Sequence, residues 1–404
     1  MVFLRFLRRL ALTVLALAVT AAVLCGYALA IVATRAVPTL PAAPANIPVP
    51  ETAAFDWTRP SSVAVGTLGG GLKATAGDTG PRATASLAKV ITVLVVASIH
   101  PLGATEDGPS ITMTSADVAR IGAVQAKGGV AYPVASGQVW TQRQLLAAIL
   151  LVSANNLADG YAVWGFGSMD AYRAAGMAWL RDHHLTHTVI GSDACGLDPA
   201  TTSTTADLFE LGRLFEADPA LSAIVDATSA TGPGGVAIEG HDPLVTHDGY
   251  VGIKTGTLSV AGYCLIVANR QVIGDQTVIV IGVVLGETDN DARYQAGRDL
   301  VNWALANLVP AGVAAGQPYG YVTTPEGALL PIVAQHGIDG VRWRDEPITV
   351  TLDLPATGFT MPLVDGTPLG EVGVLGQTVP LVVVGDVARP DLEWRLGHLR
   401  QLAW

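Results

Sequence analysis

The chain has 404 residues, half of them apolar and 14% charged, and its formal net charge at pH 7 is −11. The length suggests two or three domains, and the apolar content is ample for a core. Acidic residues outnumber basic ones by 34 to 23. No nucleic-acid partner is therefore expected, because such partners are bound through clustered lysine and arginine side chains.

The N-terminus predicts export. Residues 1–9 form a basic end with three arginines, and residues 10–33 carry no charged side chain. A helix over this run would be about 36 Å long, enough to cross a hydrocarbon core of ~30 Å. The basic end would stay in the cytoplasm and the rest would lie outside it. Ala28-Leu29-Ala30 could serve as a cleavage site. Both a removable signal and a retained membrane anchor remain open, so the protein is expected outside the cytoplasm, either anchored in the membrane or secreted.

Residues 34–60 predict a spacer. Prolines recur through an alanine-rich stretch, at Pro38, Pro41, Pro44, Pro48 and Pro50. Such a stretch cannot form a helix and extends as a semi-rigid linker. It would hold the following domain away from the membrane.

Residues 61–308 have the pattern of one mixed domain of strands and helices. A hairpin is expected around Val63–Gly66, with its turn at Gly69–Gly71. The apolar run Val90–Ile99 is rich in β-branched residues, but its length favours a buried helix. Thr141 and Gln144 fit a capping box for a helix. That helix would end near Ser153-Ala154-Asn155-Asn156, polar residues that suit a break and a new N-cap.

The later part of the chain predicts mainly strands. Strands are expected over 250–257, 261–269 and 277–285, followed by a closing helix over 291–308. Residues 309–404 predict a separate β-rich domain. Apolar and polar residues alternate there over Ile348–Leu354, and Asp365-Gly366 marks a turn.

Two of the four lysines stand in patterns that suggest chemistry. The first pattern is Ser86-Leu87-Ala88-Lys89. On a helix, Ser86 and Lys89 would share one face. Burial would lower the pKa of Lys89, and a neutral amine could take the proton of Ser86 and make it a nucleophile. Ser-x-x-Lys alone is a weak signal.

The second pattern is Ser153 and Asn155 at the expected helix break. Ser153 could relay a proton to a leaving amine, and Asn155 could hold a substrate amide. Simple helix capping by both residues explains the tripeptide equally well.

The third pattern is Lys254-Thr255-Gly256-Thr257 at the end of an apolar strand. Gly256 would let a ligand lie along the strand edge, while Lys254, Thr255 and Thr257 could bind a carboxylate. An exposed strand end with a solvated lysine is the alternative. The three patterns in this order, behind an export signal, are far more specific than any one of them.

With these three patterns, the chain resembles the serine D-alanyl-D-alanine carboxypeptidases among the low-molecular-mass penicillin-binding proteins. The likeness covers about residues 61–308, including Gly196-Leu197-Asp198-Pro199, and extends to a β-rich tail like that of some members. It implies an α+β fold of the serine β-lactamase and DD-peptidase type, in which an antiparallel sheet packs with helices and a helical subdomain. It implies no cofactor and no metal.

The resemblance also implies roles for the residues. Ser86 would be acylated, Lys89 would be its base and Ser153 the proton relay. Asn155 and Lys254 would hold the substrate, with Thr255 and Thr257 on its terminal carboxylate. The oxyanion hole would use the backbone N–H groups of Ser86 and Thr257. The substrate would be the peptidoglycan stem pentapeptide, and penicillins would acylate the same serine.

Two other enzyme classes compete with this hypothesis. A β-lactamase needs a deacylating glutamate, and no Glu-x-x-Leu-Asn lies between the second and third patterns, so Glu210, Glu216 or Glu239 would have to serve. A zinc peptidase is suggested by His183 and His187 at helical i,i+4 spacing, but no glutamate lies between them.

Two further questions stay open. A non-catalytic penicillin or muropeptide sensor could keep all three patterns, although residues 1–9 are too short for a cytoplasmic output domain. Cys195 and Cys264 could form a disulfide outside the cytoplasm or remain two buried thiols.

Overall fold

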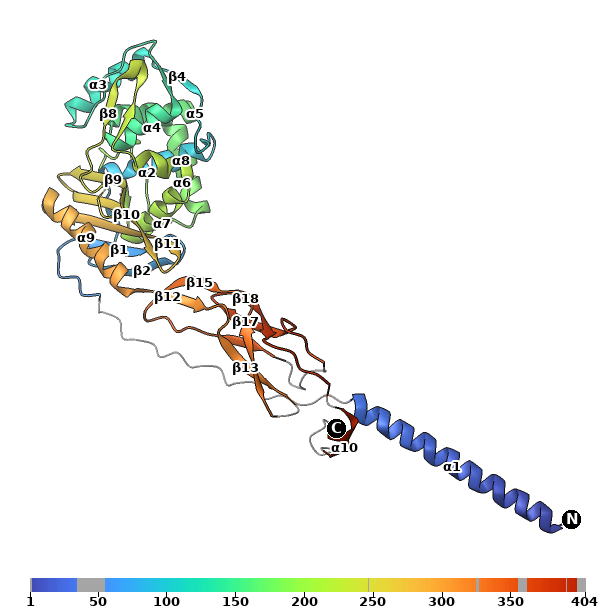
Figure 1. Ribbon diagram of the computed structural model, residues 1–404. Helices are drawn as coiled ribbons and strands as arrows, with labels where there is room; N and C mark the ends of the chain where they lie inside the picture. Colours follow the sequence, from blue (N-terminus) through green and yellow to red (C-terminus); the bar gives the residue numbers. More distant parts are fainter. Residues whose placement is uncertain are drawn as a thin grey trace. The chain divides into compact units, whose positions relative to one another are not determined.

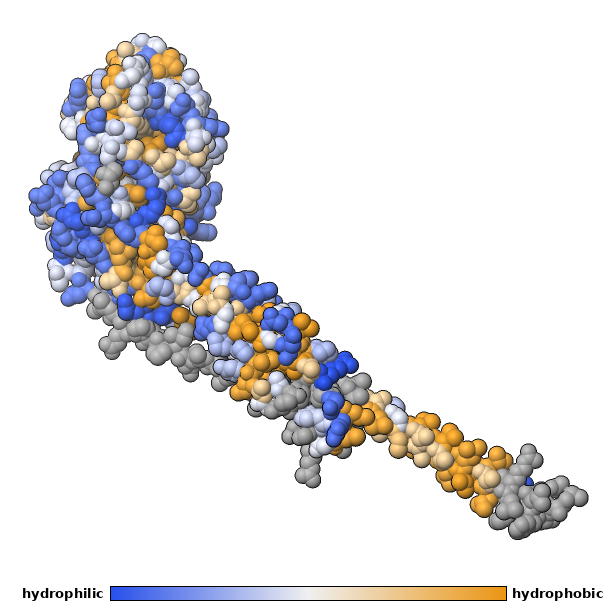
Figure 2. Space-filling model, in the orientation of Figure 1, coloured by the Kyte–Doolittle hydropathy of each residue, from blue (hydrophilic) through white to orange (hydrophobic). Residues whose placement is uncertain are grey.

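The computed structural model describes residues 2–34, 55–245, 247–324, 327–354, 362–389 and 391–397. Helix α1 runs from Val2 to Thr34, and its segment Arg9–Ala30 is long and apolar enough to cross a membrane. The part of α1 that is coloured in Figure 2 is mainly apolar on its visible face. Most of the predicted spacer, residues 35–54, lies outside the described residues. The rest of the chain contains two compact units, one formed by residues 51–309 with 342–344 and the other containing the C-terminal strands.

The first unit contains a five-stranded antiparallel sheet of order β2-β1-β11-β10-β9 (Figure 1). Its strands are β1 (Ser62–Thr67), β2 (Gly71–Ala76), β9 (Tyr250–Leu258), β10 (Gly262–Ile273) and β11 (Gln276–Glu287). The predicted N-terminal hairpin is therefore confirmed, and β1 pairs with β11 so that Ser62 lies opposite Leu285. This pairing leaves β9 at one edge of the sheet.

Helices cover both faces of this sheet. Gly297 of α9 (Asn290–Asn307) lies against Leu265, whereas Gly212 of α7 (Thr205–Glu216) lies against Ile266. Consecutive residues of a strand point to opposite faces. The closing helix and α7 therefore sandwich the sheet between them.

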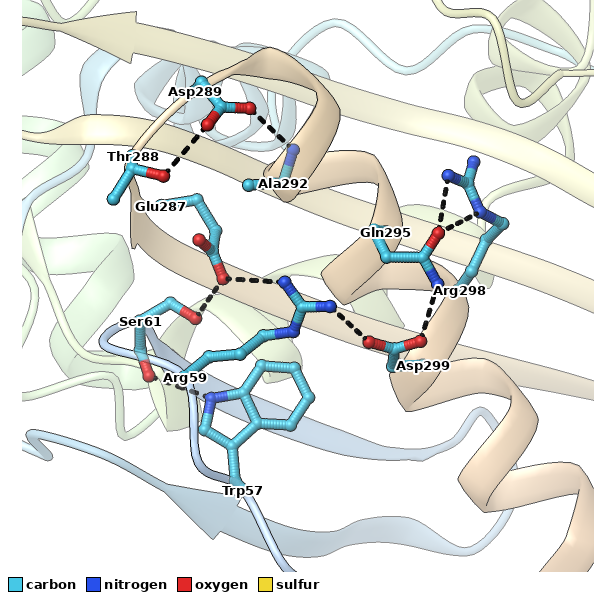
Figure 3. Close-up of polar contacts among 10 residues, drawn as sticks. All are labelled: Trp57, Arg59, Ser61, Glu287, Thr288, Asp289, Ala292, Gln295, Arg298 and Asp299. Atoms are coloured by element: carbon cyan, nitrogen blue, oxygen red, sulfur yellow. Dashed lines mark hydrogen bonds and ion pairs between the residues drawn. The ribbon is translucent and has the colours of Figure 1, made fainter.

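The segment just before β1, which contains Trp57, Arg59 and Ser61, is held by polar contacts (Figure 3). The Arg59 guanidinium donates to Asp299 Oδ2 at 2.7 Å and lies 4.0 Å from Glu287 Oε1. Ser61 Oγ donates to Glu287 at 2.7 Å, and the Trp57 indole N–H donates to the Ser61 carbonyl. These contacts tie the start of the domain to β11 and α9, near its C-terminal end.

The remaining elements of the first unit lie between β2 and β9. The helical elements are η1 (Ala85–Leu87), α2 (Ala88–Ala97), α3 (Ser115–Ala126), α4 (Gln142–Leu151), α5 (Asn155–Phe166), α6 (Met169–Asp182), α7, α8 (Pro219–Val225) and η2 (Pro233–Gly235). Short strand pairs are β3 (Arg82–Ala83) with β6 (Thr202–Ser203), β4 (Ser110–Thr112) with β5 (Val139–Thr141), and β7 (Ser229–Thr231) with β8 (Ala237–Glu239).

Two helix predictions are confirmed here. The apolar run forms α2, in which every residue from Ala88 to Val96 is buried, so packing on all sides outweighs the β propensity of its side chains. The capping box of α4 is complete, because Thr141 accepts from the Gln144 N–H and Gln144 accepts from the Thr141 N–H.

The C-terminal strands form a second sheet of order β13-β14-β18-β17-β16 and a pair β12-β15. Their bounds are β12 (Leu308–Val313), β13 (Pro318–Thr323), β14 (Leu329–Ala334), β15 (Ile338–Trp343), β16 (Thr351–Asp353), β17 (Pro368–Val374) and β18 (Gln377–Val383), with helix α10 at Leu392–Gly397. Val322, Ile332 and Leu381 are in a hydrophobic core of its own. The strand predicted over Ile348–Leu354 is shorter than expected, because β17 pairs with residues 351–353 alone.

Candidate active site

Ser86 lies in a tight turn immediately before α2. Ala85 has a positive φ of 48°, and the Leu87 N–H donates to the Thr84 carbonyl at 3.2 Å. The sequence had suggested that Ser86 and Lys89 share one helix. Ser86 instead lies in a short 3₁₀ turn, and Lys89 lies in the α-helix that follows it. The two side chains still meet, with 2.8 Å between Lys89 Nζ and Ser86 Oγ. Backbone strain of the kind seen at Ala85 is often found at functional sites.

Lys89 is fully buried, and its amine has three oxygen neighbours. Besides Ser86, Nζ lies 2.6 Å from Asn155 Oδ1 and 3.0 Å from the Cys195 carbonyl. Burial lowers the pKa of Lys89 to about 8, against the opposing effects of Cys195 and two aspartates. A neutral amine has two N–H donors and one lone pair. If these donors go to Asn155 and Cys195, the lone pair is left for the proton of Ser86.

Asn155 begins α5, and its side chain is not a helix cap. The N-cap is Ala154, which has no side-chain oxygen, while Asn155 accepts from Lys89. The capping interpretation of this tripeptide is therefore wrong. Ser153 has a left-handed backbone with φ of 63°. Within the described residues the Ser153 hydroxyl makes no hydrogen bond, so the structure does not join it to Ser86 or Lys254.

The third pattern lies on the edge strand β9. Lys254 is 3% exposed, and its amine donates to the Thr255 carbonyl at 2.9 Å. Burial, together with the nearby Lys89, lowers the pKa of Lys254 well below its usual value. The interpretation as a solvated lysine is therefore wrong. Thr255 is half-buried and Thr257 is exposed at the end of the strand.

Gly256 is where β9 approaches the Ser86 turn. A Cβ on this residue would lie 3.0 Å from the Ser86 nitrogen and 3.1 Å from the Thr84 carbonyl oxygen. Glycine thus permits the close packing of the strand against the turn.

We expect Gly256→Ala to lower the rate at which penicillin acylates Ser86 by roughly 10²-fold, because it would shift the strand away from Ser86 by a fraction of an ångström. Stopped-flow measurement with a fluorescent penicillin gives this rate. Gly122→Ala is the matched control, since nothing lies within 4 Å of a Cβ at that helical position. Equal rates in both variants would show that the contact is unimportant.

Two residues near the third pattern were not predicted from the sequence. Arg293 of α9 is 5% exposed, and its Nη1 donates to the Gly256 carbonyl and to Thr257 Oγ1, each at 3.2 Å. Asp242 lines a small cavity of about 50 Å³ beside Lys254 and Thr255. Burial raises the pKa of Asp242, and Lys254 opposes this effect. An arginine in a helix and an aspartate in a loop carry no distinguishing pattern in a single sequence.

Two alternatives from the sequence are corrected by the structure. Cys195 and Cys264 are both buried free thiols, so the disulfide is not formed. Helix α6 ends at Asp182, and His183 stacks on Trp179 with 3.9 Å between ring centroids. His183 and His187 therefore do not share a helix, and the spacing that suggested zinc has no helical basis.

The glutamates considered for a β-lactamase have other surroundings. Glu210 pairs with Arg213, and the buried Glu216 accepts from Ser222. Glu239 lies on β8 and is exposed. In the described part of the chain none of the three contacts Ser86.

Comparisons with known proteins agree on the fold. The D-alanyl-D-alanine carboxypeptidase DacD of Francisella tularensis is 18% identical, with a TM-score of 0.58 over 86% of this chain and 98% of its own. Penicillin-binding protein 6B of Escherichia coli is 19% identical, with a TM-score of 0.61 over 83% and 98%. A mutant of the Streptomyces K15 DD-transpeptidase is 22% identical, with a TM-score of 0.55 over 62% of this chain and all of its own. The predicted fold class is confirmed.

Fold and family together define a serine peptidase. The sequence model of the D-alanyl-D-alanine carboxypeptidase family, Peptidase S11, matches residues 61–289. The chain belongs to this family, which confirms the resemblance drawn from its three patterns. A comparison with curated protein sequences gave no match.

Proposed function

We propose that this protein removes the terminal D-alanine from peptidoglycan stem pentapeptides through an acyl-enzyme on Ser86. The observation that carries the proposal is the 2.8 Å contact between Ser86 Oγ and the buried amine of Lys89. Family membership supplies the substrate class. No metal or cofactor is needed, because lysine supplies the base and serine the nucleophile.

In acylation, neutral Lys89 takes the proton of Ser86 while Oγ attacks the carbonyl carbon of the penultimate D-alanine. The backbone N–H groups of Ser86 and Thr257 would stabilise the oxyanion. The C–N bond then breaks, and a proton reaches the leaving amine from Lys89, with Ser153 as the proposed relay. Water hydrolyses the resulting ester, which returns the serine hydroxyl and releases the shortened peptide.

The terminal carboxylate of the substrate would bind at the end of β9. Thr255 and Thr257 offer hydroxyl donors there, and Arg293 orients Thr257 from behind through its bond to Oγ1. Lys254 adds an amine whose charged form a carboxylate would favour. Asn155 is already engaged with Lys89. Its remaining amide N–H groups could donate to a substrate carbonyl.

The place of action follows from the substrate. Peptidoglycan lies outside the cytoplasm, and residues 10–33 would carry the catalytic unit there as a signal or an anchor. The segment Arg9–Ala30 meets the length and hydropathy of a membrane span. Penicillins would acylate Ser86 in place of the stem peptide.

The test is release of D-alanine from diacyl-Lys-D-Ala-D-Ala by the full chain in detergent. We expect many turnovers per enzyme. A single burst, with labelled penicillin still attached to Ser86, would overturn the peptidase assignment in favour of a sensor. Rapid hydrolysis of penicillin without D-alanine release would indicate a β-lactamase.

A further inference from the structure

The Cys195 carbonyl that accepts from Lys89 belongs to a loop, residues 193–198, that is held by one side chain of its own. Asp193 is 7% exposed. Its Oδ1 accepts from the N–H groups of Cys195 at 3.2 Å and Gly196 at 2.8 Å, and its Oδ2 accepts from the Asp198 N–H at 2.7 Å. Three backbone donors on one carboxylate leave the loop little freedom to turn the Cys195 peptide.

A second carboxylate ties the loop to a helix of the site. Asp159 Oδ1 accepts from the Ala194 N–H at 2.9 Å, and Asp159 lies one turn after Asn155 on α5. From the other side, Thr92 of α2 donates to the Ala194 carbonyl at 2.6 Å. Helix α5 therefore positions both oxygens that accept from Lys89. It carries Asn155 itself, and through Asp159 it holds the residue next to Cys195.

The loop also packs on the nucleophile turn. Gly196 has φ of +81°, and a Cβ there would lie 1.9 Å from the Ala85 carbonyl oxygen. A shift of the loop would therefore disturb the serine and the lysine together. The carboxylates of Asp159 and Asp193 and the thiol of Cys195 lie within 4.8 Å of one another.

The titratable groups around Lys89 come from three elements. Asp159 faces it from α5, Asp193 and Cys195 face it from the loop, and Lys254 faces it from β9. Burial raises the pKa of the Cys195 thiol, so this group stays neutral. The two aspartates supply the negative charge that opposes the desolvation of the Lys89 ammonium. Burial raises the pKa of Asp159, and the Ala194 N–H and the Lys89 ammonium oppose this rise.

We propose that Asp159 and Asp193 act as a buried acidic clamp: their carboxylates hold the Cys195 carbonyl on Lys89 and place negative charge beside its amine. Both are positioning residues, because neither touches the reacting atoms. The catalytic meaning of the clamp rests on the proposed function. The effect of the clamp on the titration of Lys89 does not rest on the proposed function, and it can be measured without any turnover.

The direct test is the titration of Lys89 by NMR in the full chain in detergent, labelled with ¹³C at the lysine ε carbon. The chain has four lysines, and Lys89→Met assigns the resonance. We expect Asp159→Asn to lower the pKa of Lys89 by about one unit, because the opposite charge that favours the ammonium is removed. Asparagine keeps an oxygen for the Ala194 N–H, so this variant removes charge with little change of shape.

Asp207→Asn is the matched control. Asp207 is also 7% exposed and accepts from the His187 N–H and the Thr188 hydroxyl, but it is not among the charges that face Lys89. This control should leave the Lys89 titration unchanged. Thermal unfolding establishes that each variant is folded. If Asp159→Asn does not fold, Asp193→Asn replaces it, and we expect it to lower the pKa of Lys89 as well.

Kinetics give a second readout. The acid limb of kcat/KM for D-alanine release should move to lower pH in Asp159→Asn, whereas a merely structural role would lower the rate equally at all pH values. A folded Asp159→Asn with an unchanged Lys89 titration would overturn the clamp. A wild-type protein without turnover would overturn the proposed function and leave the NMR test of the clamp intact.

Discussion

Ser86→Ala should abolish both D-alanine release and covalent attachment of labelled penicillin. Turnover should fall by about 10⁴-fold or more, the scale seen when a peptidase loses its nucleophile. The reason is that no other hydroxyl lies within hydrogen-bonding distance of Lys89 Nζ, among the contacts the described residues make. Initial rates of D-alanine release and gel fluorescence of the penicillin adduct measure the two losses.

Ser98→Ala is the matched control for this variant. Ser98 lies at the other end of α2, and its hydroxyl donates to the Val95 carbonyl at 2.7 Å. It should keep the wild-type rate and the penicillin adduct. Penicillin attachment that survives in Ser86→Ala would place the nucleophile elsewhere.

Lys89→Met should lower kcat/KM by about 10³-fold, within the range typical for removal of a general base. Methionine fills a similar space but cannot accept a proton. In the wild type the rate should rise with pH through about 8, because the pKa of Lys89 is about 8 and its neutral form is the base. Below this pH the neutral fraction falls about tenfold per unit, and the rate should follow it.

Lys89→Met should lose the rise of the rate with pH near 8 as well as most of the rate itself. Lys73→Met is the control, because Lys73 lies on β2, at the opposite edge of the sheet from β9. Its rate and pH profile should match the wild type. A limb near pH 8 that persists in Lys89→Met would belong to another group and would remove Lys89 from the role of base.

Much of the fold could be predicted because local patterns agree with it. Alternation and turn residues indicated the hairpin at residues 62–76 and the strands β9 to β11, and the capping box at Thr141 indicated the start of α4. The Ile348–Leu354 strand was predicted too long, since alternation does not reveal how many residues a neighbouring strand will pair.

The candidate site was predictable in its residue types and less so in its contacts. The patterns named Ser86, Lys89 and Asn155, which the structure brings into one hydrogen-bonded group. They also named Ser153, whose hydroxyl has no hydrogen bond among the described residues. Arg293 was missed because its link to Thr257 depends on how α9 packs on the sheet. No local spacing encodes that packing.

The sequence by itself determined the family, the order of the three patterns and the chemistry that their side chains offer, because these depend on residue types and short spacings. Only the tertiary structure decided that Lys89 is fully buried and that its amine meets oxygens 66 and 106 positions away along the chain. It also decided that the cysteines stay apart and that Lys254 is buried. Burial and the pKa that follows from it are properties of atoms packed together from distant segments, and no single segment carries them.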